Sequence, residues 1–478
     1  MQKPAVQTVL LYDHNHALVG RLIQMFADIA RESGVWVISL SHKQPSQIKG
    51  NLEIINIFDV PQKETLENLQ KNYKHSLHRA LVPERAFYDY SSFRRSQCYS
   101  RMSEEQIAEK ITPYVNALDY VIRERIDVIV EWFPDNFLSS VASMIATEYK
   151  KPCLIPFPHY WWRDAALILD RMNMTSTIID GHYDSFYQNP ELLDMEHLER
   201  TYKKPLTTAF SFKRSKMYTF KDAVLLRINR ERSYQPVSLR NWIVRRTSAV
   251  FSSVLIKTFI STEHVPRDEP FVIYPLHISP EAAILGTAPE LADQFWLIKN
   301  ISMNLPFGVK LYVKQHPYEQ LGMGLDYDFY RRLSTLPNVR IFDRKADLNA
   351  MLDHPRFLAM TILAGTSAID AALKRKPVFM FGYSYYSRAD CFIKPSNFQD
   401  FFSRLTSIMQ ETFEFDDRAL NALLGALDKS AVRATVDLLG HKNQTDQASE
   451  YPIIWFSCLE SYNSYQRRRN EVVVQCTS

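Results

Sequence analysis

Apolar and polar positions alternate along the 478-residue chain in two similar blocks of short apolar runs and amphipathic segments. In the first block, apolar runs predict strands at 6–12, 35–40, 52–58, 127–131 and 152–157. Helical periodicity follows or separates these runs at 16–32, 103–123 and 136–149. Strands that alternate with helices in this way are typical of a parallel sheet with crossover helices, so the first block predicts a Rossmann-like domain.

The same alternation starts again after a polar segment at 261–270, where two prolines and mixed charges interrupt the periodicity. Strands are predicted at 271–275, 310–314, 339–342, 357–363 and 378–381. Helices are predicted at 288–303, 327–334, 348–352, 367–374, 397–412 and 417–427. The second block therefore predicts a second Rossmann-like domain.

We expect an α/β chain with two Rossmann-like domains facing a cleft. The boundary is placed near residue 266, which gives an N-terminal domain at 1–265 and a C-terminal domain at 266–445. Residues 165–262, with helical patterns near 190–202 and 239–259, are expected to form a helical insertion in the first domain. The tail at 446–478 is expected to return to the first domain.

Composition limits the class of protein. A hydrophobic fraction of 46% with only 12 glycines indicates densely packed globular domains. Five cysteines without C-x-x-C spacing argue against a zinc site and a disulfide framework, and favour a reducing compartment. We find neither a signal-peptide pattern nor an apolar run long enough to span a bilayer. The expected location is the cytoplasm, with any membrane contact peripheral.

Charge adds one local feature. A net charge of +4 is too small to favour nucleic acid as a partner, but ten lysines and arginines face only two acids between residues 212 and 246. This segment is either a solvated helical face or a surface that binds anionic lipid or an anionic glycan.

Candidate ligand-binding residues of the second domain follow its strands, because ligands of open α/β sheets lie beyond the carboxyl ends of the strands. Lys314 and the His316-Pro317 pair follow the strand at 310–314, where proline would hold the histidine extended over the crevice. A second pair, His354-Pro355, follows a helix and is interpreted as structural.

Two more loops of the second domain carry suitable side chains. Gly365, Thr366 and Ser367 precede a predicted helix, whose N-terminus suits a phosphate, although Ser367 and Asp370 also fit a capping box. His277 and Glu281 follow the strand at 271–275. Glu281 is either a catalytic carboxylate or an acid at the start of a helix.

The first domain is expected to contact the acceptor. Glu131 and Asp135 follow the strand at 127–131, and either carboxylate suits activation of an acceptor hydroxyl, although Asp135 also suits a helix cap. His159 and Arg163 follow the next strand and suit contacts to an anionic sugar.

Three segments together resemble the capsule polysaccharide biosynthesis family, which includes Kdo transferases. They are Ile273-Tyr-Pro-Leu-His-Ile-Ser-Pro-Glu281, Leu311-Tyr-Val-Lys-Gln-His-Pro317, and the run from Gly365 through Pro377-Val. The resemblance implies a GT-B glycosyltransferase fold and a cytidine-monophosphate-linked ulosonic acid donor such as CMP-Kdo.

The resemblance also implies roles for single residues. His316 and Pro317 match the family's donor-binding pair, and Thr366 and Ser367 match its phosphate-binding hydroxyls. Glu281 stands where the Kdo transferases have a catalytic aspartate, a departure that leaves the donor and the stereochemical course open. Glu131 matches an acidic position less closely.

The expected activity is transfer of a sugar from a nucleotide donor to a bacterial surface polysaccharide, in capsule or lipopolysaccharide O-antigen assembly. We identify no Asp-x-Asp motif that would hold a metal ion, so neither a metal nor another cofactor is expected. Alternatives are a CDP-polyol phosphotransferase, a nucleotide-sugar epimerase of the same fold, and a non-catalytic scaffold of a glycan assembly complex.

Overall fold

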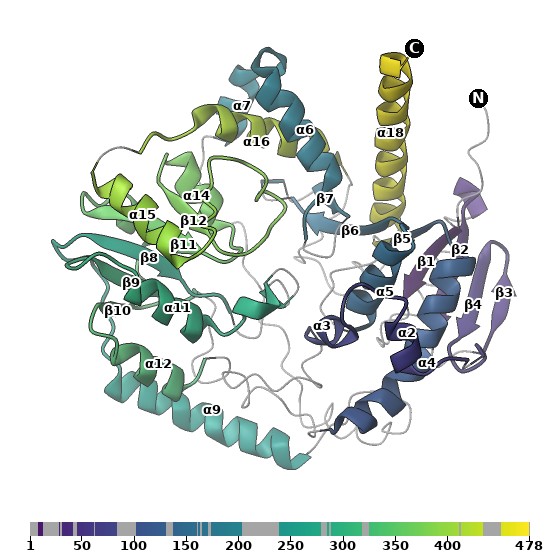
Figure 1. Ribbon diagram of the computed structural model, residues 1–478, viewed down its shortest axis with the longest axis horizontal. Helices are drawn as coiled ribbons and strands as arrows, with labels where there is room; N and C mark the ends of the chain where they lie inside the picture. The colour runs from purple at the N-terminus through teal and green to yellow at the C-terminus, as the bar shows by residue number, and fades with distance from the viewer. Residues whose placement is uncertain are drawn as a thin grey trace. The chain divides into compact units, whose positions relative to one another are not determined.

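The computed structural model shows an α/β chain that divides into two compact units, each built on a sheet (Figure 1). The structure describes residues 8–12, 28, 31–41, 45–61, 63–83, 102–130, 137–159, 161–162, 165–170, 174–202, 239–278, 284–285, 288–317, 325–410, 413–433 and 451–477. The first unit holds 1–84, 102–182 and 426–478, and the second holds 85–101 and 183–425.

The described part of the first unit contains an eight-stranded sheet in the order β13-β7-β6-β5-β1-β2-β4-β3. Its strands are β1 (Thr8–Tyr12), β2 (Trp36–Ser41), β3 (Gln47–Lys49), β4 (Leu52–Asn56), β5 (Val128–Val130), β6 (Cys153–Pro158), β7 (Ala165–Leu169) and β13 (Val432–Arg433). The five strands from β6 to β4 pair in parallel, whereas β3, β7 and β13 pair antiparallel at the edges. The parallel part has the strand order of a Rossmann fold, as the sequence predicts.

Helices of the first unit are positioned by local capping and by apolar packing. They are α2 (Leu66–Gln70), α3 (Leu77–Leu81), α4 (Glu104–Glu124), α5 (Phe137–Glu148), the start of α6 (Thr177–Gln188) and α18 (Tyr451–Thr477). Ser103 and Gln106 form a capping box at the start of α4, which satisfies backbone N–H groups that the helix leaves free. Ile454 and Leu459 of α18 join the core that the sheet forms with Val37 and Leu154.

The described part of the second unit contains a five-stranded, entirely parallel sheet in the order β10-β9-β8-β11-β12. Its strands are β8 (Phe271–Pro275), β9 (Lys310–Lys314), β10 (Val339–Phe342), β11 (Phe357–Ile362) and β12 (Val378–Met380). Its helices and short turns are η1 (Pro190–Leu192), α7 (Met195–Tyr202), α9 (Leu239–Phe259), η3 (Pro289–Leu291), α11 (Gln294–Met303), α12 (Tyr327–Ser334), α13 (Leu348–Leu352), α14 (Ser367–Leu373), α15 (Phe398–Met409) and most of α16 (Asp417–Ser430). This sheet also has the Rossmann strand order, so the predicted α/β class is confirmed in both units.

The boundaries of the compact units differ from the domains expected from sequence. The chain enters the second unit at Tyr183, within α6, and leaves it after Gly425, within α16. One reason is packing: a methyl group on Gly425 would meet the Leu193 side chain, so these segments lie in contact. The described part of the expected insertion beyond residue 182 therefore belongs to the second unit and not to the first.

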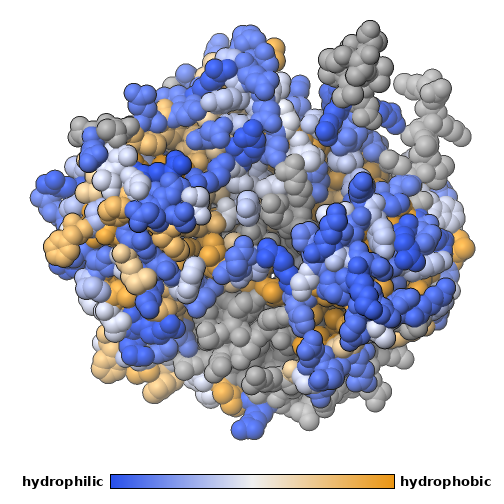
Figure 2. Space-filling model, in the orientation of Figure 1, coloured by the Kyte–Doolittle hydropathy of each residue, from blue (hydrophilic) through white to orange (hydrophobic). Residues whose placement is uncertain are grey.

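Helix α9 lies beside α12 in the second unit (Figure 1). Its packed side includes Ala249, Ser252 and Ile256, and the Ser252 hydroxyl accepts the Tyr327 backbone N–H at 2.7 Å. Apolar side chains gather at the lower left of the face in Figure 2, where Figure 1 places α9 and α12. No helix among the described residues is long and apolar enough to cross a bilayer.

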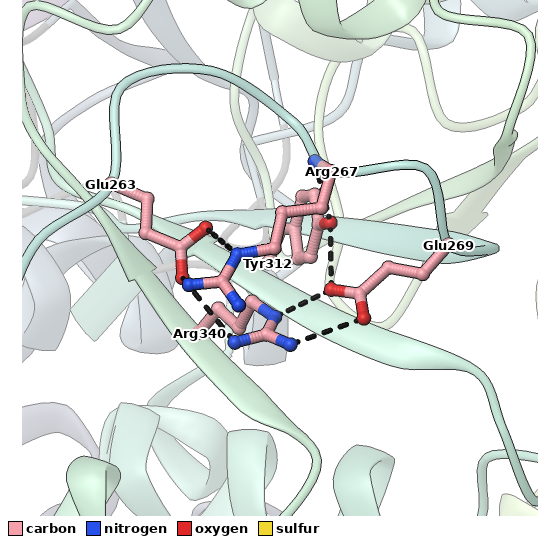
Figure 3. Close-up of polar contacts among 5 residues, drawn as sticks. All are labelled: Glu263, Arg267, Glu269, Tyr312 and Arg340. Carbon is pink, nitrogen blue, oxygen red and sulfur yellow. Dashed lines mark hydrogen bonds and ion pairs between the residues drawn. The ribbon is translucent and has the colours of Figure 1, made fainter.

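The segment expected to be an interdomain linker is fastened to the second sheet (Figure 3). Glu263 pairs with the β10 backbone, donating its N–H to Ile341 O at 2.8 Å. Arg340 of β10 binds both Glu269 carboxylate oxygens and one of Glu263, while the Tyr312 hydroxyl of β9 donates to Glu269 at 3.0 Å. The prolines end periodicity as predicted, but residues 261–270 lie along the sheet and do not separate the two units.

Candidate functional site

The candidate site lies where the strand order of the second sheet reverses. From the central strand β8, the chain adds β9 and β10 on one side and then β11 and β12 on the other. In open α/β sheets, ligands bind beyond the carboxyl ends of the strands at such a switch point. His277 follows β8 and Gly365 follows β11, so both lie at this switch point.

His277 is held in place by its backbone. The Gln294 side-chain oxygen accepts the His277 N–H at 2.9 Å, and the Gln294 amide donates to His277 O at 3.1 Å. Gln294 is itself buried and opens α11, whose first N–H groups are capped by Asp293. The preceding residue, Leu276, donates its N–H to Lys314 O at 2.8 Å, which extends the β8–β9 pairing. The His277 loop is therefore fixed to both α11 and β9.

Gly365 lies directly against the His277 ring. A methyl group built on Gly365 would lie 3.3 Å from His277 Cε1 and 2.8 Å from Ile362 Cδ1, so a side chain there would displace its neighbours. The buried Tyr386 hydroxyl donates to Gly365 O at 2.6 Å. Burial raises the pKa of Tyr386 above its ordinary value, so the hydroxyl remains protonated and keeps donating. The loops after β8 and β11 are thus packed together at the switch point.

The start of α14 differs from the predicted capping box. Thr366, and not Ser367, is the N-cap residue, and its side chain makes no capping hydrogen bond. Its backbone is already in the helical region, where a side chain does not fold back onto the first N–H groups. Thr366 is exposed and Ser367 is partly buried, so both hydroxyls lie near the surface beside Gly365.

Lys314 occupies a different position from the one expected. It is buried at the end of β9, and its ammonium donates to Gln315 O and Arg344 O, each at 3.2 Å. Burial lowers the pKa of Lys314, while Asp343 and Asp347 act in the opposite direction. Lys314 therefore fastens the ends of β9 and β10 and does not project into solvent.

His316 and Pro317 continue from this fastened strand end. Gln315 donates its N–H to Phe342 O at 3.0 Å, so the chain remains paired with β10 through the residue before His316. His316 is partly buried and Pro317 is exposed. The other His-Pro pair is different: His354 Nδ1 accepts the Arg356 N–H at 3.2 Å in the turn before β11, consistent with its structural interpretation.

His159 of the first unit is enclosed. Its Nδ1 accepts the backbone N–H groups of Trp161 and Trp162 at 3.1 and 3.2 Å, and its ring stacks on Trp162 with centroids 4.4 Å apart. The Arg433 guanidinium lies 3.4 Å from the ring centroid of Trp162. With 1% of its surface exposed, His159 closes a turn and does not offer its ring to an acceptor.

Four predicted site residues, Glu131, Asp135, Arg163 and Glu281, lie outside the described residues. Within the described ranges, no group of three or more histidine, cysteine, aspartate or glutamate side chains is arranged to hold a metal. Sequence reasoning did not find Gln294 or Tyr386. The signal for Gln294 was its place after the capping residue Asp293, whereas Tyr386 stands in a tyrosine-rich loop without a distinguishing pattern.

Comparison with known families supports the resemblance found in the sequence. Residues 199–390 match the family model described as capsule polysaccharide biosynthesis protein, which confirms the resemblance over this segment. The matched segment contains every strand of the second sheet, together with His277, His316 and Gly365. No curated protein matches the chain.

Solved structures resemble the chain only distantly. The beta Kdo 2,4 transferase KpsC of Thermosulfurimonas dismutans is 14% identical, with 63% of this chain and 80% of that chain covered and a TM-score of 0.33. The beta Kdo 2,7 transferase KpsC of the same organism is 10% identical, with 71% and 87% covered and a TM-score of 0.33. Anabaena Alr3699/HepE in complex with UDP-glucose is 10% identical, with 96% and 100% covered and a TM-score of 0.25. Similarity at this level does not establish an activity.

Proposed function

We propose that the protein is a nucleotide-sugar-dependent glycosyltransferase of the GT-B type that adds a sugar to a bacterial surface polysaccharide. The observation that supports this most directly is the packing of His277 against Gly365 at the switch point. This is the place where an α/β sheet binds a nucleotide, and it falls within the segment that matches the capsule family.

The donor is a nucleotide sugar, with CMP-Kdo or a related ulosonic acid as the leading candidate. Its phosphate lies at Thr366 and Ser367, where two hydroxyls stand beside a residue without a side chain. The His316 imidazole contacts the phosphate from the end of β9. Lys314 contributes by holding that strand end, since its ammonium already binds two carbonyl oxygens.

The transfer step uses carboxylates at Glu281 and Glu131. A carboxylate beside the reacting carbon stabilises positive charge there or activates the acceptor hydroxyl, and donors around the phosphate stabilise the leaving group. The reaction proceeds without a metal or another cofactor, and the acceptor is a glycan or lipid-linked glycan. The enzyme acts on the cytoplasmic side of the membrane.

Thermal unfolding with a panel of cytidine, uridine and guanosine nucleotides tests donor binding. A ligand present at about 100 times its Kd stabilises the folded state by about 2.7 kcal/mol. We expect cytidine monophosphate to raise the Tm, and His316→Ala to remove most of the increase. His354→Ala is the matched control, because it changes the other His-Pro pair and should keep the response.

The outcomes separate the alternatives. Stabilisation by a uridine or guanosine diphosphate would reassign the donor, and no stabilisation by any nucleotide would contradict the proposed function in favour of a scaffold. Turnover of a nucleotide sugar without an acceptor would indicate an epimerase. Phosphorus retained in the glycan product would indicate a polyol-phosphate transferase.

A further inference from the structure

The outward side of α9 carries a stripe of large apolar side chains. Five of them are more than half exposed: Ile243 at 51%, Val244 at 53%, Val250 at 66%, Phe251 at 66% and Val254 at 55%. Spacings of three, four and seven residues place these positions along one face of a helix. We name this set the α9 stripe. A contiguous group of this kind on a water-soluble surface usually marks an interaction site.

Two threonines lie on the same face of α9, but their hydroxyls make hydrogen bonds within the helix. The Thr247 hydroxyl donates to Ile243 O at 3.1 Å, and the Thr258 hydroxyl donates to Val254 O at 2.9 Å. Both hydroxyls therefore turn back onto the carbonyls of their own helix, leaving methyl groups to continue the apolar surface.

The α9 stripe is not the side by which the helix packs onto its own unit. The opposite side holds the buried Ala249, Ser252 and Ile256, and Ser252 is bonded to the start of α12 at Tyr327. When a helix carries apolar residues on two sides, one side packs against the core and the other side can be buried in a second apolar environment. The second side is presented by a helix that is already anchored.

Charge indicates which medium that is. The sequence of α9, LRNWIVRRTSAVFSSVLIKTF, has four basic residues and no acid. Arg240 and Lys257 are exposed, one near each end of the α9 stripe. Basic residues beside an apolar helical face suit an anionic membrane surface, where the apolar groups enter the headgroup boundary and the cations meet lipid phosphates. A glycan would instead require hydrogen-bonding side chains in place of valine, isoleucine and phenylalanine.

We propose that the α9 stripe attaches the protein to the surface of an anionic lipid bilayer, with α9 lying in the plane of the interface. The proposal goes beyond donor binding and transfer, because no residue of the candidate site takes part in it. The sequence offered the broad basic segment at 212–246 as a candidate lipid contact. The proposal assigns this contact to one defined face of α9.

Flotation with lipid vesicles tests this attachment on the full chain. Vesicles with about 30% phosphatidylglycerol should carry the wild-type protein, whereas neutral phosphatidylcholine vesicles should carry less. Val254→Glu and Phe251→Glu should each reduce the partition coefficient about tenfold, because a carboxylate must then enter the interface. Val265→Glu and Phe307→Glu are matched controls at other exposed sites, of 73% and 109% exposure, and should bind as the wild type does.

The other outcomes would overturn the proposal. These are no flotation of the wild type, equal losses in the stripe variants and their controls, or a wild-type dimer that Val254→Glu converts to a monomer. The last result would assign the α9 stripe to a second copy of the chain. Nucleotide stabilisation is measured on the same samples and should survive in the stripe variants. Flotation without a nucleotide response would leave the lipid contact standing while contradicting the proposed function.

Discussion

The His277 ring packs against Gly365 so closely that a methyl group on Gly365 would lie 3.3 Å from His277 Cε1. The two residues follow β8 and β11, the neighbouring strands between which the order of the second sheet reverses. Each loop therefore limits the position of the other, and a change at Gly365 acts on His277 through space.

We predict that Gly365→Ala weakens nucleotide binding about tenfold, because the ring must move away from its present place. The new methyl group would also meet Ile362 Cδ1 at 2.8 Å. This atom ends a flexible side chain and yields easily, so we expect a loss of about 1 kcal/mol in the free energy of unfolding. Nucleotide titration calorimetry and urea unfolding measure the two effects.

A second substitution separates these effects. Ile362→Val removes the Cδ1 atom that the new methyl group would meet, but leaves the His277 contact unchanged. The double variant Ile362→Val/Gly365→Ala should show a smaller stability loss than the sum of the single variants and the same weakened binding. Normal affinity in the double variant would refute the role of the His277 contact.

Gln294 offers a test of how the His277 loop is positioned. Its amide serves both backbone groups of His277, and its side chain is almost completely buried. Gln294→Leu removes both partners, so we expect it to cost about 2 kcal/mol in unfolding free energy. It should also reduce nucleotide affinity.

Gln294→Glu adds a pH readout that a purely steric role would not give. An ionised carboxylate accepts from His277 N–H but repels His277 O, whereas a protonated carboxyl replaces the amide's donor. Burial favours the protonated form. The stability deficit of this variant relative to wild type should therefore shrink between pH 8 and pH 5 in paired urea titrations. A deficit that is constant over this range would contradict the proposed hydrogen-bonding role.

The third prediction concerns the fastened segment at 261–270. Arg340 lowers the pKa of Glu269, with a further contribution from the Tyr312 hydroxyl, so the pair stabilises the fold above the ordinary Glu pKa of 4.5. A double-mutant cycle of Arg340→Met and Glu269→Gln should give a coupling of about 1–2 kcal/mol at pH 7. The coupling should fall as the pH drops below 4.5, because protonation then removes the negative charge of Glu269.

Proteolysis distinguishes a fastened segment from a flexible linker. Wild type should resist cleavage by trypsin after Arg267, and Arg340→Met should be cleaved there more rapidly. Rapid cleavage of the wild type at this site would restore the linker interpretation.

The second sheet shows why part of the fold was predictable from sequence. The strands at 271–275, 310–314 and 339–342 have the predicted bounds, since each is a short apolar run with a distinct end. The rule that ligands lie beyond strand ends then led directly to His277 and Gly365. Their mutual contact required the strand order, which pairs β8 with β11 across a long separation in sequence.

Other features depended on contacts that periodicity does not encode. The predicted helix at 288–303 is divided into η3 and α11, because the Asp293 side chain caps a new start. Gln294 is the first residue of α11, so the break between η3 and α11 places its side chain where it can bind the His277 backbone. Lys314 was expected to bind the ligand because it stands at the end of a strand, yet its ammonium binds neighbouring carbonyl oxygens. The segment at 261–270 has the sequence pattern of a linker, because its contacts with Tyr312 of β9 and Arg340 of β10 cannot be read from its own residues.

The last prediction concerns the pH dependence of the first unit. His182 of α6 is partly buried beside the Tyr465 ring, with centroids 5.5 Å apart. Burial lowers the pKa of His182 to about 4, and the positive charges of Lys429 and Arg468 lower it further. In the unfolded chain its pKa returns to the ordinary 6.5. The neutral ring therefore favours the folded state fully above pH 6.5, and this contribution is lost as the pH falls from 6.5 to about 4.

The expected loss over this range is about 3 kcal/mol in the free energy of unfolding of the first unit. We predict that His182→Gln, which has no titrating ring, lacks this part of the pH dependence. The free energy of unfolding is measured in urea at each pH, with amide hydrogen exchange reporting on the first unit. Lys429→Met should keep most of it, because burial is the larger cause of the lowered pKa. Parallel pH profiles for the wild type and His182→Gln would show that His182 takes up its proton equally in both states. A profile flattened as much by Lys429→Met as by His182→Gln would instead make the neighbouring charge, and not burial, the main cause.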